Sequence, residues 1–437
     1  MNIPANARGW MLALRKTAIL TLLVATIASS QGSRDGKPVS KASGSGRAVL
    51  YASVDKELTQ YDIDFDSAAL IKRGSITLTE SVQEAVQHPS KRYLYVTWSN
   101  GRVGPDGKPP ADSQSGLTAF QIDPASGALL PHGQPALLPA RAIYITTDVP
   151  GTHVLAAHNN PSGLTVYQIE PDGTIGQQVK QPQPLDVGVY GHNVHVEPSN
   201  DTVIVLTRGY GPTATKPEVP GAIKVFSYKD GVLENRASIA PEGGLNFQVR
   251  HLDFHPSRPW VFITLERQNK LEVYDMLKDG MLSNKPLFIK DTLAEPSNAR
   301  SWQILGTVHV HPNGKFVYVA NRASVTTDFE GKPVFAGGEN NIAVFSINQE
   351  TGEPTLIQNI DTQGIHARTF SVDPSGRILV AANTMEESVR DASGVKTVPG
   401  SLAVFRVRSD GKLDFVRKYD LDLGTRQLFW AGIVALP

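Results

Sequence analysis

Short stretches of alternating apolar and polar residues follow one another along most of this chain, separated by turn residues. The segment AVQHPSKRYLYVTW is typical, because two apolar stretches flank a turn that contains Pro89. Comparable segments recur at spacings of 61, 48, 58, 56 and 62 residues. They surround Pro150, Pro198, Pro256, Pro312 and Pro374. A β-rich unit at this spacing predicts a repeat architecture rather than an irregular β domain.

A second kind of turn closes each unit. Strand-like runs such as LTVYQIE and LAVFRVR lead into tight turns at Pro171-Asp172-Gly173 and Ser409-Asp410-Gly411. Asp-Gly between alternating runs favours a hairpin turn. A calcium loop is the rival interpretation, but the further Asp residues and the terminal Glu of such a loop are missing. Each unit therefore predicts four strands joined by turns.

Four-stranded units in tandem predict an all-β fold, a seven-bladed β-propeller with four-stranded antiparallel blades. Six units are complete, and two strand-like fragments remain at residues 47–64 and 424–436. We expect these fragments to form the seventh blade together, so that both termini close the ring. This closure leaves no strand edge open at the seam.

The first residues predict export rather than a folded element. Basic residues up to Lys16 precede an apolar run at 17–28 and the small residues Ser29 and Ser30. This pattern is typical of a signal peptide over residues 1–30, with an uncleaved anchor as the alternative. The polar stretch 31–46 has the composition of a flexible linker, which leaves residues 47–437 for the propeller. We therefore expect a periplasmic or secreted protein that leaves the membrane once the signal is removed.

Candidate chemistry follows from two equivalent positions in each unit, six residues before the turn proline and ten after it. On an antiparallel hairpin these residues lie roughly opposite each other, at the strand ends away from the proline turn. In a propeller the first strand of each blade lines the central channel, so the pairs are expected to ring one channel mouth. The pairs are Gln83/Ser99, Tyr144/Asn160, His192/Arg208, Arg250/Glu266, Gly306/Arg322 and Arg368/Thr384.

Four arginines at equivalent ring positions predict a positive mouth suited to a carboxylate or a phosphate. His192 and Glu266 are candidates for proton transfer, although Arg250 and Glu266 could simply form an ion pair that holds their hairpin. The 42 basic and 42 acidic residues balance, which gives no basic field for nucleic acid. The absence of cysteine excludes thiolate catalysis and Cys-ligated zinc. No nucleotide-binding loop and no serine hydrolase elbow occurs.

At these residues the chain resembles the seven-bladed propeller lactonases, namely the bacterial 6-phosphogluconolactonases of the propeller type and the fungal 3-carboxy-cis,cis-muconate lactonising enzymes. The motifs are GHNVHVEPSN, VRHLDFHPSRPWVFITLERQNKLEVYD, GTVHVHPNGKFVYVANR and HARTFSVDPSGRILVAANT. The resemblance implies a catalytic set without metal or other cofactor, which by motif falls on His192, Arg250, Glu266 and Arg368.

The expected activity is metal-independent hydrolysis of an anionic or sugar lactone by a monomer, with Arg208, Arg322, Tyr144 and Asn160 binding the substrate. His192 or Glu266 would activate water. Three alternatives remain: a lactonising cycloisomerase, a non-catalytic binding propeller and a calcium-dependent lactonase. Long connections follow Arg208 and Arg322, and an exported protein fits poorly with a cytoplasmic sugar phosphate. Both features point to a different lactone.

Overall fold

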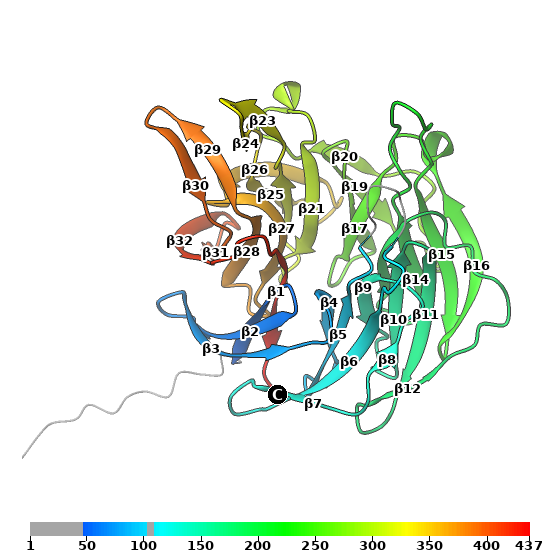
Figure 1. Cartoon of the computed structure of the whole chain (residues 1–437). Coiled ribbons are helices and arrows are strands. Elements are labelled where there is room, and N and C mark those ends of the chain that lie inside the picture. The colour runs from blue at the N-terminus through cyan, green and yellow to red at the C-terminus, as the bar shows by residue number, and fades with distance from the viewer. Residues whose placement is uncertain (1–46, 103–108) are drawn as a thin grey trace, which may run out of the picture. The chain divides into compact units, whose positions relative to one another are not determined.

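The computed structural model describes residues 47–102 and 109–437, so the signal peptide and the linker expected at 1–46 lie outside the described residues. Seven antiparallel sheets follow one another in the chain around a common centre, which confirms the predicted seven-bladed propeller (Figure 1). The described helical turns are two short 3-10 segments, Pro241–Gly244 and Pro296–Asn298. In this part of the chain no helix has the length and apolarity needed to cross a membrane.

Each blade is named here by its strands from the centre outward. Blade 1 contains β33 (Leu428–Ala435), β1 (Ala48–Val54), β2 (Glu57–Asp64) and β3 (Ala69–Thr77). Blade 2 contains β4 (Val82–Gln87), β5 (Tyr93–Ser99), β6 (Ser115–Ile122) and an outer strand split into β7 (Leu129–Pro131) and β8 (Ala136–Leu137). Blade 3 contains β9 (Ala142–Thr147), β10 (His153–Asn159), β11 (Ser162–Ile169) and β12 (Ile175–Gln178).

The remaining blades follow the same order. Blade 4 contains β13 (Gly191–Val196), β14 (Thr202–Thr207), β15 (Ala222–Lys229) and β16 (Val232–Ile239). Blade 5 contains β17 (Val249–Phe254), β18 (Trp260–Leu265), β19 (Lys270–Asp275) and β20 (Phe288–Asp291). Blade 6 contains β21 (Ile304–Val310), β22 (Phe316–Arg322), β25 (Asn341–Ile347) and β26 (Pro354–Asp361). Blade 7 contains β27 (Ile365–Val372), β28 (Ile378–Met385), β31 (Ser401–Val407) and β32 (Leu413–Asp420).

The innermost strands form a closed ring, because each of β4, β9, β13, β17, β21, β27 and β33 contacts the next. The ring is closed by blade 1, in which β33 from the C-terminal end pairs with β1 from the N-terminal end. Their register joins Ala48 to Ala435 and Ala52 to Ala431. The predicted closure by both termini is therefore confirmed.

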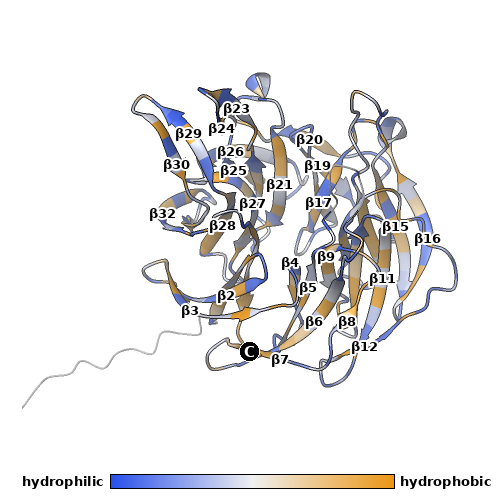
Figure 2. Cartoon of the chain, in the orientation of Figure 1, coloured by the Kyte–Doolittle hydropathy of each residue, from blue (hydrophilic) through white to orange (hydrophobic). Residues whose placement is uncertain are grey.

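The hydrophobic core lies between neighbouring blades rather than within one. Trp260 and Phe262 of blade 5, for example, share a cluster with Val308 and Val317 of blade 6. In Figure 2 the hydrophobic colour accordingly concentrates on the strands of the blades. The hairpin turns join adjacent blades: Gly173 has φ +88°, and its missing Cβ leaves room for the Tyr93 ring of the preceding blade. The predicted hairpin turn thus also seals a blade interface.

Two additional hairpins extend from the ends of second strands. One, β23 (Thr326–Phe329) and β24 (Lys332–Phe335), follows β22, and the other, β29 (Glu387–Asp391) and β30 (Gly394–Val398), follows β28 (Figure 1). They contact each other, and the Arg390 guanidinium lies 4.0 Å from the centre of the Phe329 ring. The long connection expected after Arg322 therefore contains ordered β structure.

Candidate active site

A cavity of about 380 Å³ lies where the inner strands begin and the second strands end. Six of the eight predicted site residues line it: His192, Arg208, Arg250, Glu266, Arg322 and Arg368. The cavity is called the mouth cavity below. The other residues that line it are Arg102, Arg141, Ile143, Tyr190, Ile304, Ser324, His366, Thr384, Met385, Gln427 and Phe429.

β-Bulges aim the key side chains into the mouth cavity. In blade 4, Gly191 pairs with Thr207 and Asn193 with Leu206, so His192 is the extra residue between them. In blade 5, the ladder resumes at Leu252 after Val249, which leaves Arg250 unpaired. A bulge bends the strand and re-aims the extra side chain. Arg250 and Glu266 are therefore offset along the ladder, and their side chains form the predicted cross-strand ion pair.

Tyr144 and Asn160 are not among the residues that line the mouth cavity. In blade 3 the residue that begins the turn, Asp148, is separated from Pro150 by Val149, whereas in other blades the proline follows directly. Counting from the proline therefore shifts the predicted position by one residue. Ile143 is the bulged residue of this blade, because Ala157 pairs with Tyr144 and His158 with Ala142. Ile143 lines the cavity in place of Tyr144.

Glu266 lies at the centre of a buried ion-pair cluster. Its Oε2 is 2.8 Å from Nη1 of Arg208, and its Oε1 is 3.0 Å from Nε of Arg250 and 2.7 Å from Nη2 of Arg322. Burial alone would raise the pKa of Glu266, but the three guanidinium groups outweigh it and hold the pKa below its ordinary value. Glu266 is therefore a permanent carboxylate near neutral pH and a weak base, and it fixes the positions of three arginines.

Arg368 has a different environment. It makes no ion pair within 4.0 Å in the described part of the chain. Its Nη1 donates to the Phe429 carbonyl at 3.0 Å, and its guanidinium stacks 3.7 Å from the centre of the Phe429 ring. Burial, followed by the neighbouring Arg250, lowers the pKa of Arg368 well below its usual range. An anionic ligand would supply the missing countercharge.

His192 is buried and neutral near physiological pH, because burial and then the Arg250 charge hold its pKa well below 6.5. Its Nδ1 has no partner among the described residues. The ring stacks against Tyr190 and lies 5.2 Å from the ring of His251. A neutral imidazole with a free nitrogen can accept a proton from water.

Several lining residues do not occupy the two counted positions. Arg141 directly precedes β9, and its Nε donates to Oε1 of Gln83 at 2.6 Å. His366 accepts a hydrogen bond at Nε2 from Nη1 of Arg322, at 2.6 Å. Phe429 belongs to β33, whose blade lacks the turn proline from which positions were counted. The sequence signal for Arg141 was its place just before an inner strand.

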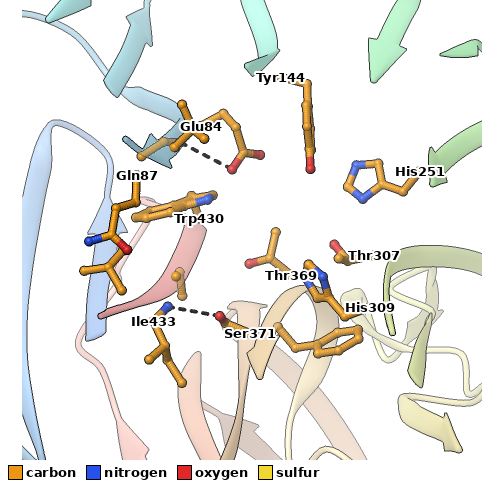
Figure 3. A pocket seen from close by; sticks show the side chains of 16 residues that line it. Glu84, Gln87, Tyr144, His251, Thr307, His309, Thr369, Ser371, Trp430 and Ile433 are labelled. Carbon is orange, nitrogen blue, oxygen red and sulfur yellow. Dashed lines mark hydrogen bonds between the residues drawn. The ribbon is translucent and has the colours of Figure 1, made fainter. Parts of the chain in front are cut away.

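A second cavity of about 210 Å³ continues the channel behind the mouth cavity. Figure 3 shows Glu84, Tyr144, His251, Thr307 and Thr369 around it. Burial raises the pKa of Glu84 to about 8, against the opposing effect of Arg368. Two residues that line this inner chamber, His251 and Thr369, directly follow Arg250 and Arg368 of the mouth cavity.

The lining of the mouth cavity combines six arginines with a single glutamate, a formal excess of five positive charges. Such a cavity can bind an anion and stabilise an oxyanion. Across residues 47–102 and 109–437, no group of three or more histidine, aspartate and glutamate side chains is arranged to hold a metal ion.

The sequence and the fold match known proteins. Residues 49–392 match the family model described as lactonase, 7-bladed beta-propeller. The 6-phosphogluconolactonase of Bacillus subtilis is 27% identical over 282 residues, covering 62% of this chain and 72% of that protein. The 6-phosphogluconolactonase of Erwinia tasmaniensis is 28% identical over 323 residues, covering 72% and 82%.

Solved structures show the same fold. The periplasmic gluconolactonase PpgL of Pseudomonas aeruginosa aligns with a TM-score of 0.65 and 19% identity, over 90% of this chain and 100% of that one. A protein from Lactobacillus plantarum aligns with a TM-score of 0.66 and 20% identity, over 90% and 100%. Because the family model covers most of the chain, this protein belongs to the seven-bladed β-propeller lactonase family.

Proposed function

We propose that this lactonase hydrolyses a negatively charged sugar lactone without a metal ion. The observation that carries the proposal is the mouth cavity, in which five positive charges are uncompensated and Arg368 has no carboxylate partner among the described residues. A lactone that bears a carboxylate or phosphate would supply that charge. The 6-phosphogluconolactonases named above and the gluconolactonase PpgL are named after sugar lactones, which supports this substrate class.

In the proposed mechanism, Arg368 and Arg250 hold the anionic substrate and polarise the lactone carbonyl. The oxygen of a water molecule bonds to the carbonyl carbon while His192 accepts one proton from that water. The ring C–O bond then breaks, and the departing alkoxide takes the proton back from His192. The new carboxylic acid ionises at neutral pH, so each turnover releases one proton.

The remaining arginines of the mouth cavity bind the substrate. Arg208 and Arg322 contact Glu266 and also line the cavity, so we assign them to substrate binding together with Arg141. Glu266 is a positioning residue, since both of its carboxylate oxygens are already paired with arginines. Tyr144 and Asn160 are given no role at the mouth. We also propose a monomer that is exported by its first 30 residues, which places the reaction in the periplasm or outside the cell.

The test is hydrolysis of a panel of sugar and aliphatic lactones, with and without an acidic group, followed by acid release with a pH-sensitive dye. We expect turnover of an anionic lactone that is unchanged by EDTA and falls at least about a hundredfold in His192→Ala. His132→Ala is the matched control, because His132 lies outside the mouth cavity and bonds the Asp172 carbonyl. Loss of turnover in EDTA would contradict the metal-free reaction. Formation of a lactone from an acid, with no hydrolysis, would favour the cycloisomerase.

The raised pKa of Glu84 leads us to expect that KM for an anionic substrate depends on pH. Its buried carboxyl faces Arg368, Arg250, Tyr144 and Trp430, and it is protonated below its pKa of about 8. As the pH rises through this value, the new carboxylate offsets the positive charge of Arg368. KM is therefore expected to rise by up to about tenfold between pH 7 and 9, the equivalent of one pKa unit of coupling.

In Glu84→Gln the KM should stay constant over this range. Glu272→Gln is the control, since Glu272 is also buried with a raised pKa but hydrogen-bonds Tyr274 away from the channel. The same rise of KM in Glu84→Gln would refute the assignment.

A further inference from the structure

Trp302 is a large aromatic residue that the packing of the fold does not require. It is 56% exposed, more than any other aromatic side chain among the described residues. Its backbone has φ +56°, a left-handed conformation that costs energy for a bulky residue. Backbone strain kept at an exposed aromatic residue points to a binding role, because the fold gains little from burying that ring.

The loop around Trp302 is held rigidly at the rim of the mouth cavity. The next residue, Gln303, donates from Nε2 to the Glu339 carbonyl at 2.9 Å and accepts at its carbonyl from Asn269 at 3.0 Å. Ile304, two residues after Trp302, lines the cavity. These bonds anchor the backbone next to Trp302 beside the mouth cavity.

Arg267 ties the indole to the other side of the rim. Its guanidinium carbon lies 3.6 Å from the centre of a Trp302 ring. Arg267 directly follows Glu266, the centre of the ion-pair cluster. Blades 5 and 6 thus bring an arginine and a tryptophan together just outside the mouth cavity.

Arginine–aromatic pairs also occur inside the cavity, where Arg141 lies 5.4 Å from the Phe429 ring centre. Arg208 lies 4.2 Å from the Tyr190 ring centre and Arg368 lies 3.7 Å from the Phe429 ring centre. Both of these pairs line the mouth cavity. The Arg267–Trp302 pair is an exposed member of the same series, since Trp302 is 56% exposed.

The loop that carries Trp302 also lines a polar hollow. Its volume is about 450 Å³, and its lining includes Asn298, Arg300 and Gln303 from the Trp302 loop, with Glu339, Asn340 and Asn359 opposite. The buried Nδ2 of Asn340 has no partner within the part of the chain that the structure describes. Amide, carboxylate and guanidinium groups beside an open indole match a sugar ring, which has an apolar C–H face and a rim of hydroxyl groups.

We propose that Arg267 and Trp302 form an outer subsite for a second sugar ring, attached to the lactone ring that enters the mouth cavity. The C–H face of the second ring stacks on Trp302, and its hydroxyl groups face Arg267 and the polar hollow. This inference rests on the proposed function and refines its substrate to a lactone with two sugar rings.

The test uses stable sugar acids in place of lactones, so it does not depend on turnover. The dissociation constants of gluconate and of maltobionate, a gluconate that carries a glucose ring, are measured by calorimetry for the whole protein. The wild type should bind maltobionate at least about fivefold more tightly than gluconate. Trp302→Ala should abolish this difference and leave gluconate binding within about twofold, and Trp302→Phe should restore most of it.

Phe415→Ala is the control, because Phe415 is another exposed aromatic residue, on β32 at the outside of blade 7. Equal binding of both acids by the wild type, or an unchanged preference in Trp302→Ala, would overturn the outer subsite. Lactone hydrolysis by a wild type that shows no such preference would overturn the subsite and leave the proposed function standing. A wild type that prefers maltobionate but hydrolyses no lactone would support the subsite and overturn the proposed function.

Discussion

Replacing Glu266 with glutamine is expected to lower kcat/KM by at least about a thousandfold and to destabilise the fold by about 3–5 kcal/mol. The carboxylate is the shared partner of Arg208, Arg250 and Arg322, at 2.7 to 3.0 Å. Without it, the buried Arg250 and Arg322 and the partly buried Arg208 face one another with no countercharge and lose their positions. Chemical denaturation and steady-state kinetics of the same variant measure the two effects together.

The control is Glu272→Gln, a buried glutamate whose hydrogen bond comes from Tyr274 and whose loss leaves no cation unpaired. Glu266→Asp keeps the charge and should retain more stability than Glu266→Gln, with activity still reduced because the shorter side chain cannot reach all three arginines. An inactive Glu266→Gln with wild-type stability would contradict the positioning role and favour a direct proton transfer by Glu266.

The Glu266 cluster also sets a pH dependence of stability. The folded pKa of Glu266 is lowered, by the arginine charges against the opposing effect of burial. Its contribution is therefore complete above the unfolded pKa, about 4.3, and is lost as the pH falls towards the folded value. The stability difference between wild type and Glu266→Gln should be constant above about pH 5 and should shrink as the pH falls below about 4.

Replacing Arg368 with methionine is expected to raise KM for an anionic lactone by at least about a hundredfold while leaving the protein as stable as the wild type, or more stable. Arg368 is buried without an ion pair in the described residues, and its charge is repelled first by Arg250 and then by Arg322. Exchanging such a charge for an apolar side chain of similar volume is often neutral or stabilising. The site therefore keeps Arg368 charged for the ligand and not for the fold.

Arg322→Met is the matched comparison. Arg322 lies 2.7 Å from Glu266, so its replacement should destabilise the protein. The melting temperatures of the two variants, measured in the same buffer, show which arginine stabilises the fold. A fall in melting temperature for Arg368→Met as large as that for Arg322→Met would show that Arg368 also supports the fold.

The fold was predictable because turn residues mark the hairpins of each repeat. The prolines marked the inner hairpins, and the Asp-Gly turns marked the outer ones, where Gly173 and Gly411 have φ near +80°. Closure by both termini followed from the two unmatched fragments. The β23–β24 and β29–β30 hairpins were not predicted, because their short strands, such as TTDF, lack the apolar alternation of the blades.

The candidate site was predictable only where the repeat keeps its length. Six of the eight named residues line one cavity because their turn prolines stand at equivalent positions. The one-residue displacement of Pro150 moved the count from Ile143 to Tyr144. The bulges at His192 and Arg250 follow from ladder geometry, which alternation of side chains does not reveal. Phe429 was missed because β33 has no turn proline.

The closing strand β33 also links completion of the ring to completion of the mouth cavity. Phe429, which holds Arg368 through its carbonyl and its ring, lies on β33. During translation the ribosome makes β33 after every other strand of the propeller. A chain in which β33 has not yet joined β1 has an open ring and an unsupported Arg368. We therefore expect the mouth cavity to form last in folding, and a protein truncated before β33 to hydrolyse no lactone.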